Sequence, residues 1–186
     1  MKKLFPIALT VILFSNSPAA DEDPRILESR AITQEFKDAL KSEMQSALKL
    51  GGPGKAIEVC SVRAPMIAHK LSQQTGWHVA RTSLKPRNRS NAPDGWEFKV
   101  LKSFEQRRAK GESPQDIEFA EETMKGGEKV FRYMKAIGTA PVCLTCHGEN
   151  IAPELATQLD TYYPQDKARG FKKGDIRGAF TLTHPL

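Results

Sequence analysis

The chain lacks any apolar run near the roughly 18 residues that a membrane-spanning helix needs. Its longest mostly apolar segment, Leu4–Phe14, has only 11 residues, so no membrane span is expected after this segment is removed. The basic residues are spread along the sequence rather than gathered in one stripe, which argues against a nucleic-acid-binding surface. No internal repeat or low-complexity segment stands out among the 186 residues. The length and ordinary composition fit one soluble domain.

The N-terminus has the pattern of a secretory signal peptide. Lys2 and Lys3 precede the apolar segment, and Ser17-Pro18-Ala19 supplies small residues before a cleavage point. We expect residues 1–19 to be removed and 20–186 to form the mature domain in the bacterial periplasm. No cysteine lies near the cut, so a lipoprotein is not expected. Losing two lysines leaves 26 basic against 22 acidic residues, a net charge of +4 that would favour an acidic redox partner.

The periodicity of apolar residues predicts an α+β fold. The "GGPG" stretch (51–54) turns the chain between two helices, and Gly76 ends the second of them. Asp94 has the position of an N-cap residue. We expect helices at 24–50, 57–75, 94–110, from 113 and at 154–159, and strands at 77–84, 128–137 and 176–183. The sum is one domain with helices packed on a small antiparallel sheet.

The three cysteines are the most informative residues. Cys143 and Cys146 stand three positions apart, and His147 follows at once. This CxxCH motif is typical of haem c, because the two thiols reach both vinyl groups and the histidine lies below the iron as proximal ligand. Export favours the same interpretation, since haem c is attached outside the cytoplasm. The sequence therefore predicts one covalent haem c, and it leaves Cys60 as an unpaired cysteine.

Three alternatives to haem remain open for this motif. Zinc needs two further ligands, and the other histidines (His69, His78 and His184) are isolated in the sequence. A thioredoxin-like dithiol usually follows a strand in a βαβ unit, whereas this pair is expected in a loop after Pro141. Chance is a roughly one-in-a-thousand event for this composition. A zinc or dithiol protein stays as the alternative from another class.

Four blocks of sequence resemble the Tll0287-like (DUF3365) haem domain family. They are "AIEVCSVRAP" (56–65), "RTSLKPRNRSNAPDGWE" (81–97), "PVCLTCHG" (141–148) and "GDIRGAFTLTHPL" (174–186), in this order. The resemblance covers roughly residues 26–186 and implies a PAS-like fold with one haem c. It also implies a distal cysteine thiolate, which corresponds to Cys60. From spacing alone, Cys60 is better explained as a small apolar residue of the hydrophobic core than as a ligand.

Further candidate residues surround the expected haem. Arg81, Lys85 and Arg87 would pair with the haem propionates, unless they belong to a solvated basic loop. Tyr162, Tyr163 and Phe171 are expected to wall the pocket. His184 is the reserve distal ligand, and no methionine follows the motif. His69 and His78 are expected at the surface.

We expect a periplasmic mono-haem cytochrome that acts in one-electron transfer or redox sensing with a separate redox partner protein. The alternative is a sensor of a small diatomic ligand, NO or CO, working with a separate signalling partner. An enzyme such as a small peroxidase would need an acid–base residue at the distal side, and none is identifiable.

Overall fold

The computed structural model describes residues 22–186, so the expected signal peptide (1–19) lies outside the described residues. The elements in chain order are α1 (Pro24–Thr75), β1 (His78–Thr82), η1 (Arg89–Asn91), α2 (Gly95–Ala109), β2 (Glu118–Lys125), β3 (Glu128–Gly138), η2 (Pro141–Cys143), α3 (Leu144–His147), α4 (Pro153–Tyr162) and β4 (Ile176–Pro185). Within this range no helix is both long and apolar enough to cross a membrane.

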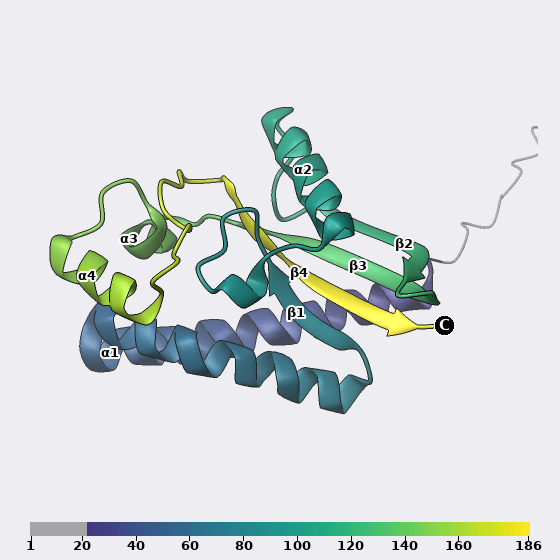
Figure 1. Cartoon of the computed structure of the whole chain (residues 1–186), viewed down its shortest axis with the longest axis horizontal. Coiled ribbons are helices and arrows are strands. Elements are labelled where there is room, and N and C mark those ends of the chain that lie inside the picture. Colours follow the sequence, from purple (N-terminus) through teal and green to yellow (C-terminus); the bar gives the residue numbers. More distant parts are fainter. Residues whose placement is uncertain (1–21) are drawn as a thin grey trace, which may run out of the picture.

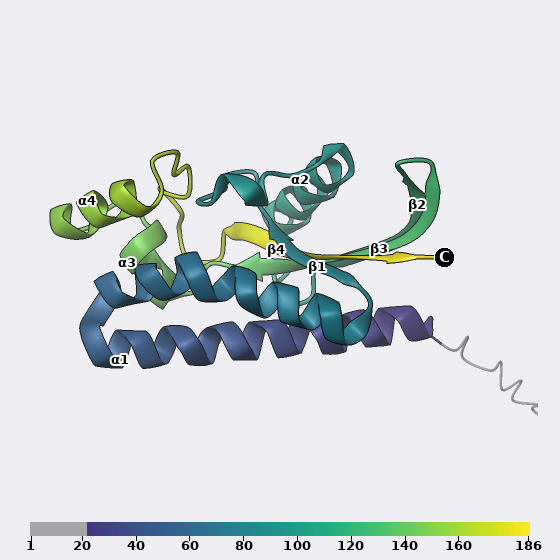
Figure 2. The same ribbon diagram turned by 60° about the horizontal axis from the view of Figure 1, so that its bottom comes forward.

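α1 is a pair of helical arms that run back along each other (Figures 1 and 2). The helical conformation breaks at Gly51 and Gly52, where the expected turn lies, and Gly52 has a φ of 67° that favours glycine. Asp23 caps the first arm by accepting from the Arg25 N–H at 2.9 Å, and Gly76 closes the second in the left-handed conformation. The two predicted helices are confirmed.

The four strands form one antiparallel sheet in the order β1-β4-β3-β2. The side chains of alternate residues of β3 lie on opposite faces of the sheet. Phe131 and Tyr133 belong to the core between the sheet and α1, whereas Met134 and Ala136 belong to the core between the sheet and α2. Figure 2 shows the resulting three layers, with α1 on one face of the sheet and α2 on the other. The predicted α+β class is confirmed.

Two local predictions are wrong. No helix begins at 113; a turn at 114–116 leads instead into β2, which the sequence analysis missed. β2 is an edge strand with mostly solvent-exposed side chains, so the sequence shows no apolar alternation there. The CxxCH motif also does not lie in a loop, because η2 runs directly into α3 and residues 141–147 together form about two helical turns.

Candidate functional site

A cavity of about 680 Å³ lies between the arms of α1 and the start of the sheet. Both arms contribute apolar side chains to it, and β1, η2, α3 and the beginning of β4 complete its wall. α3 and α4 lie at the same end of the molecule as the turn of α1 in both views (Figures 1 and 2). The exposed Val142 lines the cavity beside the motif, so the space reaches solvent there.

All three residues of the CxxCH motif line this cavity. Within the described residues, Cys143 and Cys146 form no disulfide; they lie one helical turn apart, so they share one side of the backbone. His147 follows at the end of α3. Two thiols and an imidazole therefore border a single, mostly apolar space.

His147 is held in one orientation by the polypeptide. Its Nδ1–H donates to the Ala168 carbonyl oxygen at 2.8 Å, which leaves the lone pair of Nε2 for another partner. Burial, together with the charges of Arg177 and Arg87, lowers the pKa of His147 to about 3. The ring is therefore neutral, as a metal ligand must be. Arg177 Nε lies 3.4 Å from His147 Nε2.

Cys60 lines the same cavity from the second arm of α1. Burial raises the pKa of the Cys60 thiol, and the nearby charges of Arg81 and Arg87 oppose that rise. Cys60 is only partly buried and belongs to no hydrophobic cluster of the core, which disfavours its role as a core filler. Met44, on the first arm, also lines the cavity and is a second sulfur that the sequence analysis did not single out.

Three arginines line the cavity: Arg81, Arg87 and Arg177. Arg87 pairs with Asp166 at 3.1 Å. Within residues 22–186, neither Arg81 nor Arg177 has a carboxylate within salt-bridge distance. Burial lowers the pKa of Arg177 to about 10 and also lowers that of Arg81. An apolar cavity with two uncompensated cations suits an apolar ligand that carries negative charge.

Arg177 was missed because it comes into the site from β4, 30 residues beyond His147. Its Nη1 donates to Ser83 Oγ at 3.1 Å, which ties the beginning of β4 to the end of β1. The only available signal was its position in the last of the four sequence blocks. Lys85, in contrast, does not line this cavity; it is exposed and lines a neighbouring one.

Of the aromatic residues and the reserve histidine that the sequence suggested, only some lie at the cavity. Tyr163 lines the cavity, but Tyr162 is 46% exposed and does not, which corrects the expectation for it. Phe171 packs edge-on against the His147 ring, with 6.2 Å between the centroids. His184, the expected reserve ligand, instead packs on Trp77 with 4.8 Å between the ring centroids and is not part of the lining.

His69 and His78 are exposed, as expected, and they also line the far part of the cavity. His69 lies nine residues beyond Cys60 on the helical arm, about 13 Å along its axis. No three His, Cys, Asp or Glu side chains in the described part of the chain gather as a metal-ion site would require. A zinc site built on the CxxC pair therefore lacks its further ligands.

The fold and the site together define a class: a single α+β domain whose apolar, cationic cavity is bordered by a CxxCH motif. The chain belongs to the Tll0287-like family, whose sequence model matches residues 20–185. The crystal structure of the cyanobacterial heme-protein Tll0287 is similar, with 25% sequence identity and a TM-score of 0.63. The similarity covers 89% of this chain and 98% of that one. No curated protein matches.

Proposed function

We propose that this protein is a periplasmic mono-haem c-type cytochrome that acts in one-electron transfer or redox sensing. Cys143 and Cys146 would carry the thioether bonds, His147 would be the proximal ligand and Cys60 the distal ligand. The observation that carries the proposal is the orientation of His147, whose Nδ1–H is committed to Ala168 while its ring borders the cavity. The similarity to a protein described as a heme-protein supports the same conclusion.

The cavity fits this cofactor in size and charge. Its volume of about 680 Å³ is within the range of about 300–1,000 Å³ typical of cofactor sites. The apolar side chains of the α1 arms suit a porphyrin, and Arg81 and Arg177 supply cations for two propionates. Arg87 is already paired with Asp166, so we assign it the lesser part in this contact.

Bound haem would supply one electron through its Fe(III)/Fe(II) couple. The chain's own part is to hold the ligands and to exclude water. Ala168 fixes the His147 tautomer, and a Cys60 thiolate would favour the ferric state and so lower the reduction potential. The solvent-reaching rim at Val142 gives a partner protein access to the site.

Electron transfer or redox sensing is favoured over peroxidase chemistry by the polar groups near Cys60. The charges that act on the thiol are those of the Arg81 and Arg87 guanidinium ions. The Tyr163 phenol also lies near it, and burial raises the pKa of Tyr163 to about 12, so the phenol stays protonated near neutral pH. A guanidinium donates hydrogen bonds but does not accept a proton, so it cannot serve as the acid–base residue that a peroxidase needs.

The test is the visible absorption spectrum of the exported protein, oxidised and reduced, made in a strain that attaches haem c. We expect a low-spin, six-coordinate oxidised spectrum that becomes high-spin in Cys60→Ala, whereas Met44→Leu leaves it unchanged. The reverse pattern would assign the distal position to Met44. A protein without a Soret band would refute the haem proposal altogether. Binding of carbon monoxide to the reduced protein would favour a sensor of a small diatomic ligand over an electron-transfer protein.

A further inference from the structure

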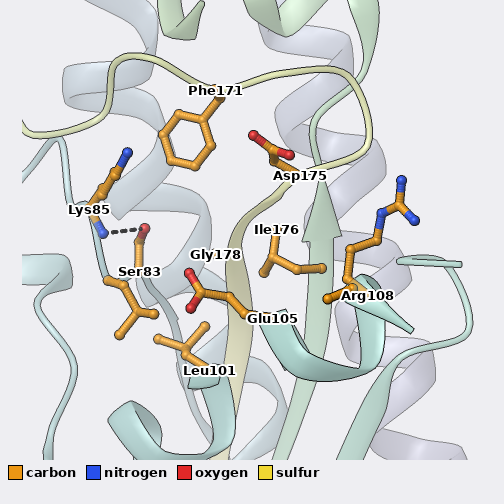
Figure 3. Close-up of a pocket in the computed structure, with 11 residues that line it drawn as sticks. Ser83, Lys85, Leu101, Glu105, Arg108, Phe171, Asp175, Ile176 and Gly178 are labelled. Atoms are coloured by element: carbon orange, nitrogen blue, oxygen red, sulfur yellow. Dashed lines mark hydrogen bonds between the residues drawn. The ribbon is translucent and has the colours of Figure 1, made fainter. Parts of the chain in front are cut away.

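A second cavity, of about 490 Å³, lies beside the first, on the α2 side of the molecule (Figure 3). The C-terminal half of α2, the chain that follows β1 and the segment 171–176 form its walls. Ser83 and Gly178 line both cavities, so the two cavities adjoin at this part of the backbone. Leu101, Phe171 and Ile176 give the second cavity an apolar surface (Figure 3).

The basic and acidic side chains that line this cavity form no salt bridge with each other. Lys85 and Arg108 both line it, and within residues 22–186 neither has a carboxylate partner. Arg108 donates its Nε–H to the Gly174 carbonyl oxygen at 2.7 Å. This hydrogen bond anchors the side chain and leaves its Nη groups free for a ligand. Lys85 lies with Nζ 5.2 Å from the centroid of the Phe171 ring.

The two acidic residues of the lining have other contacts. Glu105 pairs with Lys102 at 2.9 Å on the surface of α2. Asp175 accepts the Lys172 backbone N–H through Oδ2 at 2.7 Å, so only Oδ1 is free to face a ligand. The lining thus has two cations without a salt bridge in the described part of the chain, against Glu105, which is paired with Lys102, and Asp175, which is partly satisfied. The two cations complement a negatively charged group attached to an apolar body.

We propose that this cavity binds a small organic acid with a compact apolar body, and that its occupancy is transmitted to His147 through Phe171. Phe171 lines the second cavity, and its backbone N–H donates to the His147 carbonyl oxygen at 2.9 Å. Its ring also packs edge-on against the imidazole. Arg177 adds a second link, because its guanidinium lies 5.2 Å from the Phe171 centroid and 3.2 Å from His147 Nδ1.

Binding is tested by calorimetry of the purified holoprotein with phenylacetate, with benzyl alcohol as the uncharged control. We expect phenylacetate to bind and benzyl alcohol not to bind. Lys85→Ala and Arg108→Gln should each raise the Kd about tenfold or more, since each removes a charge-assisted contact. Lys99→Ala removes an exposed lysine of α2 that does not line the cavity and should leave the Kd unchanged.

Lys85→Ala keeps the test valid if Arg108→Gln fails to fold, because the Lys85 side chain is exposed. Comparison with phenylalanine distinguishes plain acids from amino acids, whose ammonium group would use the free oxygen of Asp175. No measurable binding of either acid at concentrations up to about 10 mM would overturn the proposal, as would an equal loss in Lys99→Ala.

The transmission step rests on the proposed haem function and has its own measurement. Saturating phenylacetate should shift the midpoint potential of the holoprotein. Phe171→Leu should not show that shift, even at phenylacetate concentrations that calorimetry shows to saturate the variant. An unchanged potential in the wild-type protein would refute transmission but leave the binding result standing. A protein without haem would refute the proposed function, while the calorimetric experiment on the cavity would still be decisive.

Discussion

The ion pair beneath the CxxCH motif gives the sharpest quantitative prediction. Asp166 Oδ1 lies 3.1 Å from Arg87 Nε, and these side chains are only 1% and 11% exposed. Asp166 also accepts the Ala168 backbone N–H at 2.8 Å. Arg87 in turn donates to the carbonyl oxygens of Ala168 and Cys146. The pair therefore fixes the carbonyl that orients His147.

Replacing Asp166 with Asn removes the charge and leaves the Arg87 guanidinium enclosed without its counterion. Breaking a buried pair in this way costs about 3–5 kcal/mol. The lower end of this energy range applies here for two reasons. The amide oxygen of Asn still accepts one hydrogen bond, and Arg169, the second ion-pair partner of Asp166, is about a third exposed. We expect a loss of about 3 kcal/mol in the free energy of unfolding, or about 6–12 °C in Tm for a chain of this length.

Urea unfolding at pH 7 measures this loss, and Asp160→Asn is the matched control. Asp160 pairs with the same Arg169 at 2.5 Å but is 66% exposed, so its replacement should cost at most about 0.5 kcal/mol. Similar losses in the two variants would refute the reasoning, because they would show that burial and the contact with Arg87 do not set the energy.

Two further predictions concern the sheet. Burial opposes ionisation of Glu118, but hydrogen bonds from Arg30, Tyr133 and a neighbouring lysine outweigh it and lower the pKa to about 2. Because this pKa lies below the ordinary 4.5, the stability that Glu118 contributes is complete above pH 4.5 and disappears as the pH falls toward 2. The difference in unfolding free energy between wild type and Glu118→Gln should close over that range; a constant difference would contradict the assignment. Gly178→Ala should cost about 1–3 kcal/mol, since its Cβ would overlap the last carbonyl oxygen of β1. Gly95→Ala, which meets no atom within 4 Å, is its control in thermal unfolding and should show no such loss.

Elements whose signals are local could be predicted from the sequence. Asp94 begins α2 with a capping box, in which its side chain accepts the Glu97 N–H and Glu97 accepts in return. The turn at Gly51 and Gly52 was equally visible, because it depends on neighbouring residues alone. β2 could not be found in this way: its strand conformation comes from pairing with β3 along its whole length, while its own side chains remain polar.

The candidate site was predictable only in part. The CxxCH spacing identifies Cys143, Cys146 and His147 because the motif itself encodes the chemistry. No such motif indicates which cavity the Lys85 side chain lines. Strand alternation would put residues 81, 83, 85 and 87 on one face, but β1 ends at Thr82 and the chain bends at 84–85. Arg81 and Arg87 consequently reach the large cavity, whereas Lys85 reaches the other one.

The relation between the two cavities depends on one backbone contact rather than on either set of charged side chains. Gly178 has no Cβ, so β4 approaches the end of β1 closely there. Ser83 closes the contact by donating to the Arg177 carbonyl oxygen at 2.8 Å. Next to this contact, the Arg177 side chain reaches His147 at the large cavity. Phe171 lines the second cavity and packs against the same imidazole. A bulkier residue at position 178 would therefore disturb both cavities, although it would alter none of the residues that carry charge in either.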